Sequence, residues 1–266
     1  MRSTMFITHS KMMILAVVGL VFFASCVSAG SIADTTEEMP PTGITPTPTL
    51  IPTPTPLNPT DTPNSNLSLV IVPGGIAPII DGSLLPEEWE SAIQSEMSGG
   101  GELLLMHDGG YLYIGVRAKP EPVTSICIDQ GEQVSILHSS AALGTAIYER
   151  GDAVWEMIQG FEWCCREITD SPRAQESRSE HLEQNNWLAS NGRMGAPEDV
   201  EFKIYMPEGQ LRLAVTSIGA PDYEEITWWP VEMEDDCRNP QIIRGSIPEQ
   251  AQFSMDNWMM LMASTD

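Results

Sequence analysis

From Leu67 to Asp266 the sequence consists of short apolar runs separated by Gly, Pro, Asn and Asp, which is typical of strands joined by turns. The best hairpin is GELLLMHDGGYLYIGVRAKP at residues 101–120, where Asp108-Gly109-Gly110 tolerates the positive φ of a tight turn. After this turn, aliphatic side chains alternate with aromatic, glycine and basic residues over residues 111–118. This period of two predicts a strand with one aliphatic face and one aromatic and polar face.

The same character recurs along the chain. Nine further segments are predicted as strands: residues 68–72, 122–128, 132–138, 144–149, 153–158, 199–206, 211–218, 225–229 and 253–262. The polar stretch 169–195 is predicted as a long loop, with a helical turn around Ser177 to Gln184. So many strands with scarcely any helix predict one all-β domain over residues 67–266, built as a sandwich or a barrel.

One short helix is predicted at the N-terminal side of this domain, over Leu85 to Gln94. Pro86 suits a first helical turn, and the acidic residues after it complement the positive end of the helix dipole. Trp89, Ala92 and Ile93 then fall on one helical face. We therefore interpret Trp89 as a core residue and not as a ligand contact.

The first 66 residues predict export and a spacer. Residues 1–26 carry basic residues, then the apolar run MMILAVVGLVFFA, and end at Cys26, which is the layout of a signal peptide. Residues 23–26 resemble the lipobox of bacterial lipoproteins, so Cys26 is the predicted lipidation site; cleavage after Ala29 and plain secretion is the alternative. Residues 27–66 predict a disordered linker, and its Pro- and Thr-rich part from Pro40 to about Asn66 reaches on the order of 80 Å when extended. We expect a protein anchored by lipid on the extracellular side of the membrane.

The charge excludes some partners. The chain has 37 acidic and 13 basic residues, a formal net charge of −24. Such a surface repels nucleic acid and anionic lipid, so we expect no nucleic-acid partner and membrane attachment through the acyl chains only. Carboxylates are also the ligands that calcium prefers, and the acidic turns offer Asp129 with Glu132, or the run Glu234-Asp235-Asp236. Solvated turn acids are the other interpretation of both groups.

Four cysteines follow Cys26: Cys127, Cys164, Cys165 and Cys237. In an exported chain an even number indicates two disulfides, and four cysteines allow three pairings. A bond between adjacent cysteines is strained and rare, so we expect Cys164 and Cys165 each to pair elsewhere. Zinc is a weaker interpretation, because paired C-x-x-C motifs are absent from the sequence.

Several stretches resemble one family. The segment IDGSLLPEEWESA at residues 80–92, followed by ELLLMHDGGYLYIGVRAK, resembles the start of the family 9 carbohydrate-binding module and its DOMON-like relatives. Farther on, ICIDQGE, DVEFKIYMPEG and ITWWP resemble later strands of that family. The resemblance implies a two-sheet antiparallel β-sandwich and a non-catalytic sugar-binding role, with two aromatic rings around the sugar and a structural calcium ion. Some relatives bind haem on the same scaffold.

For the sugar contacts we select residues that are expected to be exposed. Trp187 lies in the polar stretch HLEQNNWLASNGR, close to Asn186 and Arg193, whose side chains suit sugar hydroxyls. One of Trp228 and Trp229 faces outward if EITWW is a strand, and Trp229 is the one selected.

These observations favour a non-catalytic domain that binds carbohydrate or another envelope ligand. A haem-binding redox module is one alternative, with His107 or His138 as axial ligand. A structural or protein-binding surface domain is another. The sequence contains no G-x-S-x-G, H-E-x-x-H or phosphate-loop motif, so an enzyme is not expected, although a pair of carboxylates acting on glycosides leaves no sequence motif.

Overall fold

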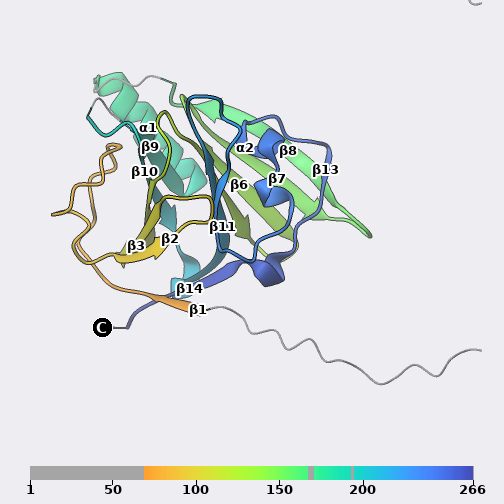
Figure 1. The fold of residues 1–266 in the computed structure, drawn as a ribbon, viewed down its shortest axis with the longest axis horizontal. Helices are drawn as coiled ribbons and strands as arrows, with labels where there is room; N and C mark the ends of the chain where they lie inside the picture. The colour runs from red at the N-terminus through yellow and green to blue at the C-terminus, as the bar shows by residue number, and fades with distance from the viewer. Residues whose placement is uncertain (1–68, 167–170, 193–194, 266) are drawn as a thin grey trace, which may run out of the picture. The chain divides into compact units, whose positions relative to one another are not determined.

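The computed structural model describes residues 69–166, 171–192 and 195–265 (Figure 1). The predicted signal peptide with Cys26 and the linker 27–66 lie outside these residues, as does Arg193. Within the described part of the chain, no helix has the length and apolar character needed to cross a bilayer.

The domain consists of two β-sheets, which confirms the predicted all-β sandwich (Figure 1). The larger sheet runs in the order β1 (Leu69–Val72), β14 (Met259–Ala263), β11 (Gln210–Ile218), β5 (Val123–Asp129), β6 (Gln133–Ser139), β7 (Leu143–Arg150), β8 (Trp155–Cys164) and β13 (Gln250–Ala251), and β12 (Thr227–Trp229) pairs with β11. The smaller sheet runs β2 (Ile93–Glu96), β3 (Glu102–Asp108), β4 (Tyr111–Arg117), β10 (Asp199–Tyr205) and β9 (Trp187–Asn191). All strand pairs of the smaller sheet are antiparallel. In the larger sheet, β1 and β14 form a parallel pair.

The predicted hairpin is the pair β3–β4, with Asp108 opposite Tyr111 and positive φ at both turn glycines. Its aliphatic face forms the core between the two sheets. Leu112, Ile114 and Val116 of β4 belong to one buried cluster with Ile126 and Ile128 of β5. Alternation along each strand therefore places one set of side chains inside the sandwich.

The outer faces of both sheets are also covered. On the larger sheet, the C-terminal segment places Trp258 and Ile242 over Ile136 and Tyr148 in a second buried cluster. On the smaller sheet, residues 80–92 pack Leu84 and Trp89 against Met106 and Tyr113 in a third. As a consequence, strands β4, β5 and β6 are buried along nearly their whole length and not only at alternate positions.

The helix predicted at 85–94 is wrong. Residues 86–91 form turns, in which Trp89 N–H donates to the Leu85 carbonyl (3.2 Å) and Ala92 N–H to the Trp89 carbonyl (3.0 Å), and β2 begins at Ile93. One helix-like turn followed by a strand satisfies the same apolar spacing, because Ile93 finds a partner in Leu105 of β3. The interpretation of Trp89 as a core residue is confirmed, since it is 5% exposed.

The polar stretch 169–195 contains a full helix where a loop with one helical turn is predicted. Helix α1 (Pro172–Asn185) lies against β9 (Figure 1). Ser171 caps it by accepting the N–H of Ala174 (3.2 Å), and Asn186 ends it in the left-handed conformation. The remaining helical pieces are α2 (Pro240–Ile243) and the 3₁₀ turns η1 (Pro207–Gly209), η2 (Asp236–Arg238) and η3 (Met255–Asn257).

Candidate functional site

The segment that carries the family resemblance is fixed to the smaller sheet by one buried carboxyl group. Oε2 of Glu201 accepts the backbone N–H groups of Asp81 (2.7 Å), Gly82 (2.7 Å) and Ser83 (3.3 Å), and Oε1 accepts the indole N–H of Trp89 (3.2 Å). Glu201 is fully buried, and this burial raises its pKa to about 7, although the four donors act in the opposite direction. The carboxyl therefore serves as a structural anchor.

A second buried carboxyl holds the next residue of the segment. Asp199 accepts the N–H of Leu84 (2.9 Å) and the Nε–H of Arg117 (2.7 Å), while Nη2 of Arg117 donates to the Leu84 carbonyl (3.1 Å). Gly82 lies between the anchors at φ +92°, and a Cβ there would be 2.3 Å from the Asn191 carbonyl oxygen. The residues that most resemble the family thus build the scaffold.

Two clefts open at opposite ends of the sandwich. The Arg212 cleft, about 700 Å³, is lined by residues that include Asp129, Gln130, Asn186, Tyr205, Glu208 and Arg212. The Asn191 cleft, about 720 Å³, is lined by residues that include Glu121, Ser139, Cys165, Arg178, Asn191 and Tyr223. Strand β5 runs from one to the other, because Val123 lines the second and Asp129 the first, a separation of about 20 Å. Both volumes suit a small ligand.

The Arg212 cleft contains an ion pair with unused hydrogen-bonding capacity. Nη1 of Arg212 lies 3.5 Å from Oδ2 of Asp129, and both side chains are mostly buried. Oδ1 of Asp129 accepts the N–H of Gly131 (2.8 Å), which fixes the carboxylate in the turn after β5. Nε of Arg212 is buried and has no hydrogen-bond partner among the described residues. It is therefore a donor that lacks an acceptor.

Tyr205, at the end of β10, is one of the residues that line the same cleft. It is 46% exposed, and its ring meets that of Tyr111 edge-on on the outer face of the smaller sheet, with 5.8 Å between the ring centres. Nζ of Lys203 lies 4.3 Å from the centre of the Tyr111 ring, which holds that ring in turn. The residues that line the cleft thus include an exposed tyrosine as well as polar groups.

All five described non-glycine residues with positive φ line one of these two clefts. Asn186 (φ 61°) and Glu208 (φ 55°) line the Arg212 cleft, while Glu121 (φ 50°), Cys165 (φ 58°) and Tyr223 (φ 58°) line the Asn191 cleft. The left-handed conformation costs free energy for residues with a Cβ, and it concentrates at functional sites. This distribution marks both cleft rims as built surfaces.

The structure places the predicted ligand residues differently from expectation. Trp187 is 1% exposed, stacks near Phe202 and donates its indole N–H to Oγ1 of Thr145 (2.9 Å), so its predicted exposure is wrong. The reason is that β9 begins at Trp187 and turns its first side chain inward. It still forms part of the Arg212 cleft, next to the exposed Asn186.

The predicted exposure of Trp229 is also wrong. Trp229 is 4% exposed and donates its indole N–H to Oγ of Ser95 (3.0 Å) in the sandwich core. Alternation holds, since the neighbouring Trp228 points to the other face, but there the guanidinium of Arg238 covers its ring at 3.7 Å. Among the described tryptophans the largest exposure belongs to Trp163, which is 38% exposed.

The calcium site stays a prediction. Asp129 pairs with Arg212, whereas Glu132 is exposed and lies 4.0 Å from Arg150, so the two acids face different arginines. In the alternative group, Asp235 accepts N–H groups of Ser254, Cys237 and Trp258, and Asp236 accepts that of Gln252. Burial raises the pKa of Asp235. The carboxylates of Asp235 and Asp236 therefore hold the turn around residue 235 against residues 252–258 of the same C-terminal segment.

The two histidines considered for haem have protein partners. Nδ1 of His138 lies 3.4 Å from Oγ of Ser125, and its Nε2 lies 3.0 Å from Oγ of Ser140. Burial lowers the pKa of His138 to about 4. Nε2 of His107 lies 3.2 Å from Oγ of Ser264. His138 is on the larger sheet and His107 on the smaller one, so the structure does not favour haem ligation by either.

The four cysteines form two disulfides. Cys127 of β5 is bonded to Cys237 of η2, and both are fully buried. The other bond joins the neighbours Cys164 and Cys165, so the expectation that each pairs elsewhere is wrong. Cys127 and Cys237 are bonded to each other on the outer face of the larger sheet, so neither is left to pair with Cys164 or Cys165. Cys165 takes the left-handed conformation directly after β8.

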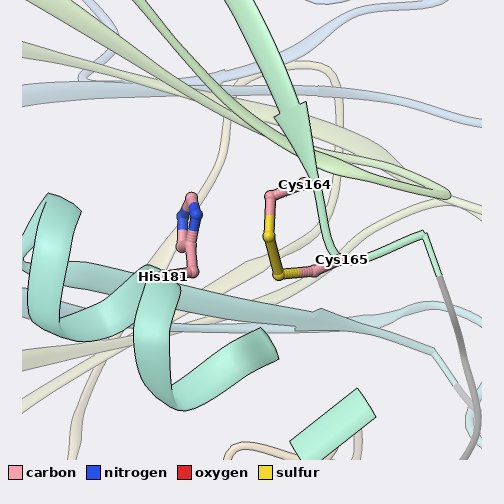
Figure 2. Close-up of side chains that lie close together, drawn as sticks. All are labelled: Cys164, Cys165 and His181. Atoms are coloured by element: carbon pink, nitrogen blue, oxygen red, sulfur yellow. A yellow bond between two sulfur atoms is a disulfide. The ribbon is translucent and has the colours of Figure 1, made fainter. Parts of the chain in front are cut away.

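The 164–165 disulfide faces a histidine. Figure 2 shows it at the end of β8, across a gap from the imidazole of His181 on α1. An imidazole nitrogen and both sulfurs lie within 4.8 Å of one another. Among the described residues, these three side chains form a group that could hold a metal ion. His181 is 5% exposed, and its pKa is lowered by burial and by the nearby Arg178.

Sequence reasoning missed Tyr205, Arg212 and the pairing of Cys164 with Cys165. Tyr205 and Arg212 lie in strands, where periodicity gives the face of a residue but not the end of the sheet at which a cleft opens. The signal available for α1 was the pair Ser171-Pro172, which suits an N-cap and first helical position.

No protein-family model and no curated protein matches this chain. Among solved structures, the chain is similar to a candidate carbohydrate-binding protein from Bacteroides uniformis ATCC 8492, with a TM-score of 0.40 and 8% sequence identity. The alignment covers 74% of this chain and 99% of that one. A likeness at this level carries no conclusion about fold or ligand, which therefore depend on the contacts within this chain.

Proposed function

We propose that this domain binds a carbohydrate in the Arg212 cleft and leaves it chemically unchanged. The observation that carries the proposal is the combination, among the residues that line one cleft, of an exposed tyrosine and several polar side chains. Tyr205 supplies the ring, Arg212 supplies its guanidinium, and Asn186 supplies an amide that makes no side-chain hydrogen bond with the described residues.

This combination matches the chemistry of a sugar. A pyranose presents an apolar C–H face, which packs on an aromatic ring, and hydroxyl groups that both donate and accept hydrogen bonds. The amide of Asn186 can do both, whereas the guanidinium of Arg212 only donates. Gln130 and Gln210 add two further amides to the lining.

The cleft is preorganised for such a ligand. The bond from Gly131 to Asp129 and the ion pair to Arg212 fix the guanidinium before any ligand arrives. Asn186 is held in place as the C-cap of α1, where its N–H donates to the Leu182 carbonyl (2.9 Å). Groups that are already ordered lose little conformational freedom on binding, which favours affinity.

The charge of the chain indicates the class of sugar. The formal net charge is −24, and Asp129 neutralises the cation in the cleft. Acidic sugars are repelled by such a surface, so the proposed ligands are neutral or amino sugars.

We further propose that the domain works on the extracellular side of the membrane, tethered through a lipid on Cys26 and spaced from it by residues 27–66. The signal-like residues 1–26 and the Pro- and Thr-rich composition of the spacer support this placement. Metabolic labelling with a palmitate analogue tests it. Label should enter the wild-type protein and be absent from Cys26→Ala, whereas an unlabelled wild type favours plain secretion.

Binding of the full chain to an array of neutral, amino and acidic glycans, followed by calorimetry with the best ligand, tests the sugar proposal. Tyr205→Ala should weaken binding by about fivefold or more, since stacking on an aromatic ring contributes on the order of 1 kcal/mol. Asn186→Gly keeps the left-handed backbone and removes only the amide, so it should weaken binding several-fold without unfolding. The matched control is Tyr223→Ala, which alters the rim of the Asn191 cleft.

The outcomes separate the alternatives. Binding that is weakened by Tyr205→Ala and Asn186→Gly but not by the control supports the proposal. The opposite pattern moves the ligand to the Asn191 cleft. A chain that binds no glycan on the array contradicts the function itself.

A further inference from the structure

We propose that Cys164, Cys165 and His181 form a redox-controlled binding site for a thiophilic cation such as Zn²⁺, closed by the disulfide and opened when that bond is reduced. The site is separate from the Arg212 cleft and does not depend on the sugar proposal. It uses two sulfur ligands and one imidazole, a donor set that Zn²⁺ accepts in proteins.

The first observation is the proximity of the three ligand atoms. They lie within 4.8 Å of one another although the sulfurs come from the end of β8 and the imidazole from α1 (Figure 2). Zn–S bonds of about 2.3 Å in a tetrahedral site place two sulfurs about 3.8 Å apart. Rotation of two cysteine side chains provides this separation once the disulfide opens, so the backbone has no large distance to move.

The second observation is the state of the imidazole. His181 is only 5% exposed, yet its Nε2 has no hydrogen-bond partner among the described residues. A buried polar atom without a partner is uncommon and costs free energy, so it calls for a ligand. Nδ1 lies 3.3 Å from the amide Nδ2 of Asn185, and the ring packs edge-on against Trp187 at 5.0 Å. These contacts orient the ring, as supporting groups do for histidine ligands.

The third observation is access. Cys164 and Cys165 are both partly exposed, and Cys165 lines the Asn191 cleft, so a dithiol reductant can reach the bond. Cys127 and Cys237 are fully buried and out of reach of the same reagent. The sulfurs of Cys164 and Cys165 also lie 4.0 and 3.6 Å from the Ser177 carbonyl oxygen, to which a thiol, but not a disulfide sulfur, can donate.

The reaction is a thiol–disulfide exchange followed by metal binding. The disulfide takes two electrons and two protons from a dithiol, which leaves as its own disulfide, and two thiols form on the protein. Zn²⁺ then displaces the two thiol protons and binds both thiolates and the neutral imidazole. Exchange with a small disulfide reverses the sequence: that disulfide takes two electrons and, with two protons from water, leaves as two thiols, while the 164–165 bond re-forms and the ion is released.

The test uses the full chain, reduced with a dithiol, desalted without oxygen and titrated with Co²⁺. We expect two more reactive thiols per chain than before reduction, a near-ultraviolet thiolate-to-cobalt charge-transfer band in the reduced protein only, and loss of that band when Zn²⁺ is added. Surface carboxylates cannot produce this band, so the acidic surface does not confuse the result.

Three variants locate the ion. Cys164→Ser with Cys165→Ser should abolish the band, and His181→Gln should weaken Zn²⁺ binding on the order of 100-fold. His107→Gln, at a histidine outside the site, should leave binding unchanged. Because His181 is buried, circular dichroism confirms that its variant folds, and the oxidised and reduced wild type compare the site without any substitution.

The proposal is overturned by any of three results. These are a disulfide that the dithiol leaves intact, a reduced wild type without the charge-transfer band, and an unchanged band in the double serine variant, which would place the ion on Cys127 and Cys237.

Discussion

Two glycines with the same backbone angle allow the anchoring of residues 80–92 to be measured. Gly82 and Gly100 both have φ of +92°, but they differ in surroundings. A Cβ on Gly82 would be 2.3 Å from the Asn191 carbonyl oxygen, whereas a Cβ on Gly100 would meet nothing within 4 Å. Replacing each by alanine therefore separates the cost of the backbone angle from the cost of lost packing space.

The magnitude follows from three contributions. The left-handed angle costs an alanine about 1–2 kcal/mol, and this applies to both variants. At Gly82 the clash with backbone adds about 1–3 kcal/mol. The shift that relieves it also breaks the 2.7 Å bond to Glu201, which leaves a buried N–H without a partner at a cost of about 1–3 kcal/mol. We expect losses of about 5 kcal/mol for Gly82→Ala and about 1.5 kcal/mol for Gly100→Ala.

Guanidinium denaturation followed by tryptophan fluorescence measures both free energies of unfolding. Trp89 reports on the same segment, because its indole N–H donates to Glu201. The reasoning is refuted if the two variants differ by less than about 1 kcal/mol, since the steric and hydrogen-bonding contributions at Gly82 would then be absent.

Three further predictions concern pH and the buried disulfide. Burial raises the pKa of Glu201 to about 7, so this carboxyl stabilises the fold most below pH 4.5 and loses its contribution as the pH rises towards 7. Across this range the free energy of unfolding of the wild type should fall by about 3 kcal/mol relative to that of Glu201→Gln. Parallel curves of stability against pH for the two proteins would contradict this prediction. Burial lowers the pKa of His138 to about 4, so the neutral ring contributes its full stability above pH 6.5. The free energy of unfolding should fall by about 3 kcal/mol as the pH falls towards 4, and His138→Gln should lack this loss. An equal dependence of stability on pH in both proteins speaks against the prediction. Replacing Cys127 and Cys237 together by alanine should lower the free energy of unfolding by about 5 kcal/mol, because their bond spans 110 residues; a change below 1 kcal/mol in denaturation would disprove a stabilising role.

The strands were predictable because their signal is local. The run from Tyr111 to Arg117 alternates with period two, and the turn before it needs residues that accept positive φ. Both facts depend on neighbours in sequence. The helix predicted at Leu85–Gln94 failed because its apolar spacing fits a single turn followed by β2 equally well, and the pairing of Ile93 with Leu105 decided between them.

The candidate site was less predictable because exposure is not local. Trp187 follows a polar helix and precedes polar residues, yet the register of β9 against β10 places it opposite Ile204 and turns it inward. Tyr205, one residue farther along β10, remains 46% exposed at the edge of a cleft. Sequence alternation distinguishes two faces of a strand, but it does not tell which face a distant segment covers.

By itself the sequence determined that the described residues fold mainly as β-strands, that Trp89 is buried and that the four cysteines after Cys26 form disulfides. The tertiary structure alone decided that both faces of each sheet are covered, that Cys164 pairs with Cys165 opposite His181, and that Arg212 and Tyr205 share a cleft. The physical reason is range. Periodicity and turn chemistry act between residues a few positions apart, whereas clefts and ligand sets form where segments on the order of 100 residues apart meet.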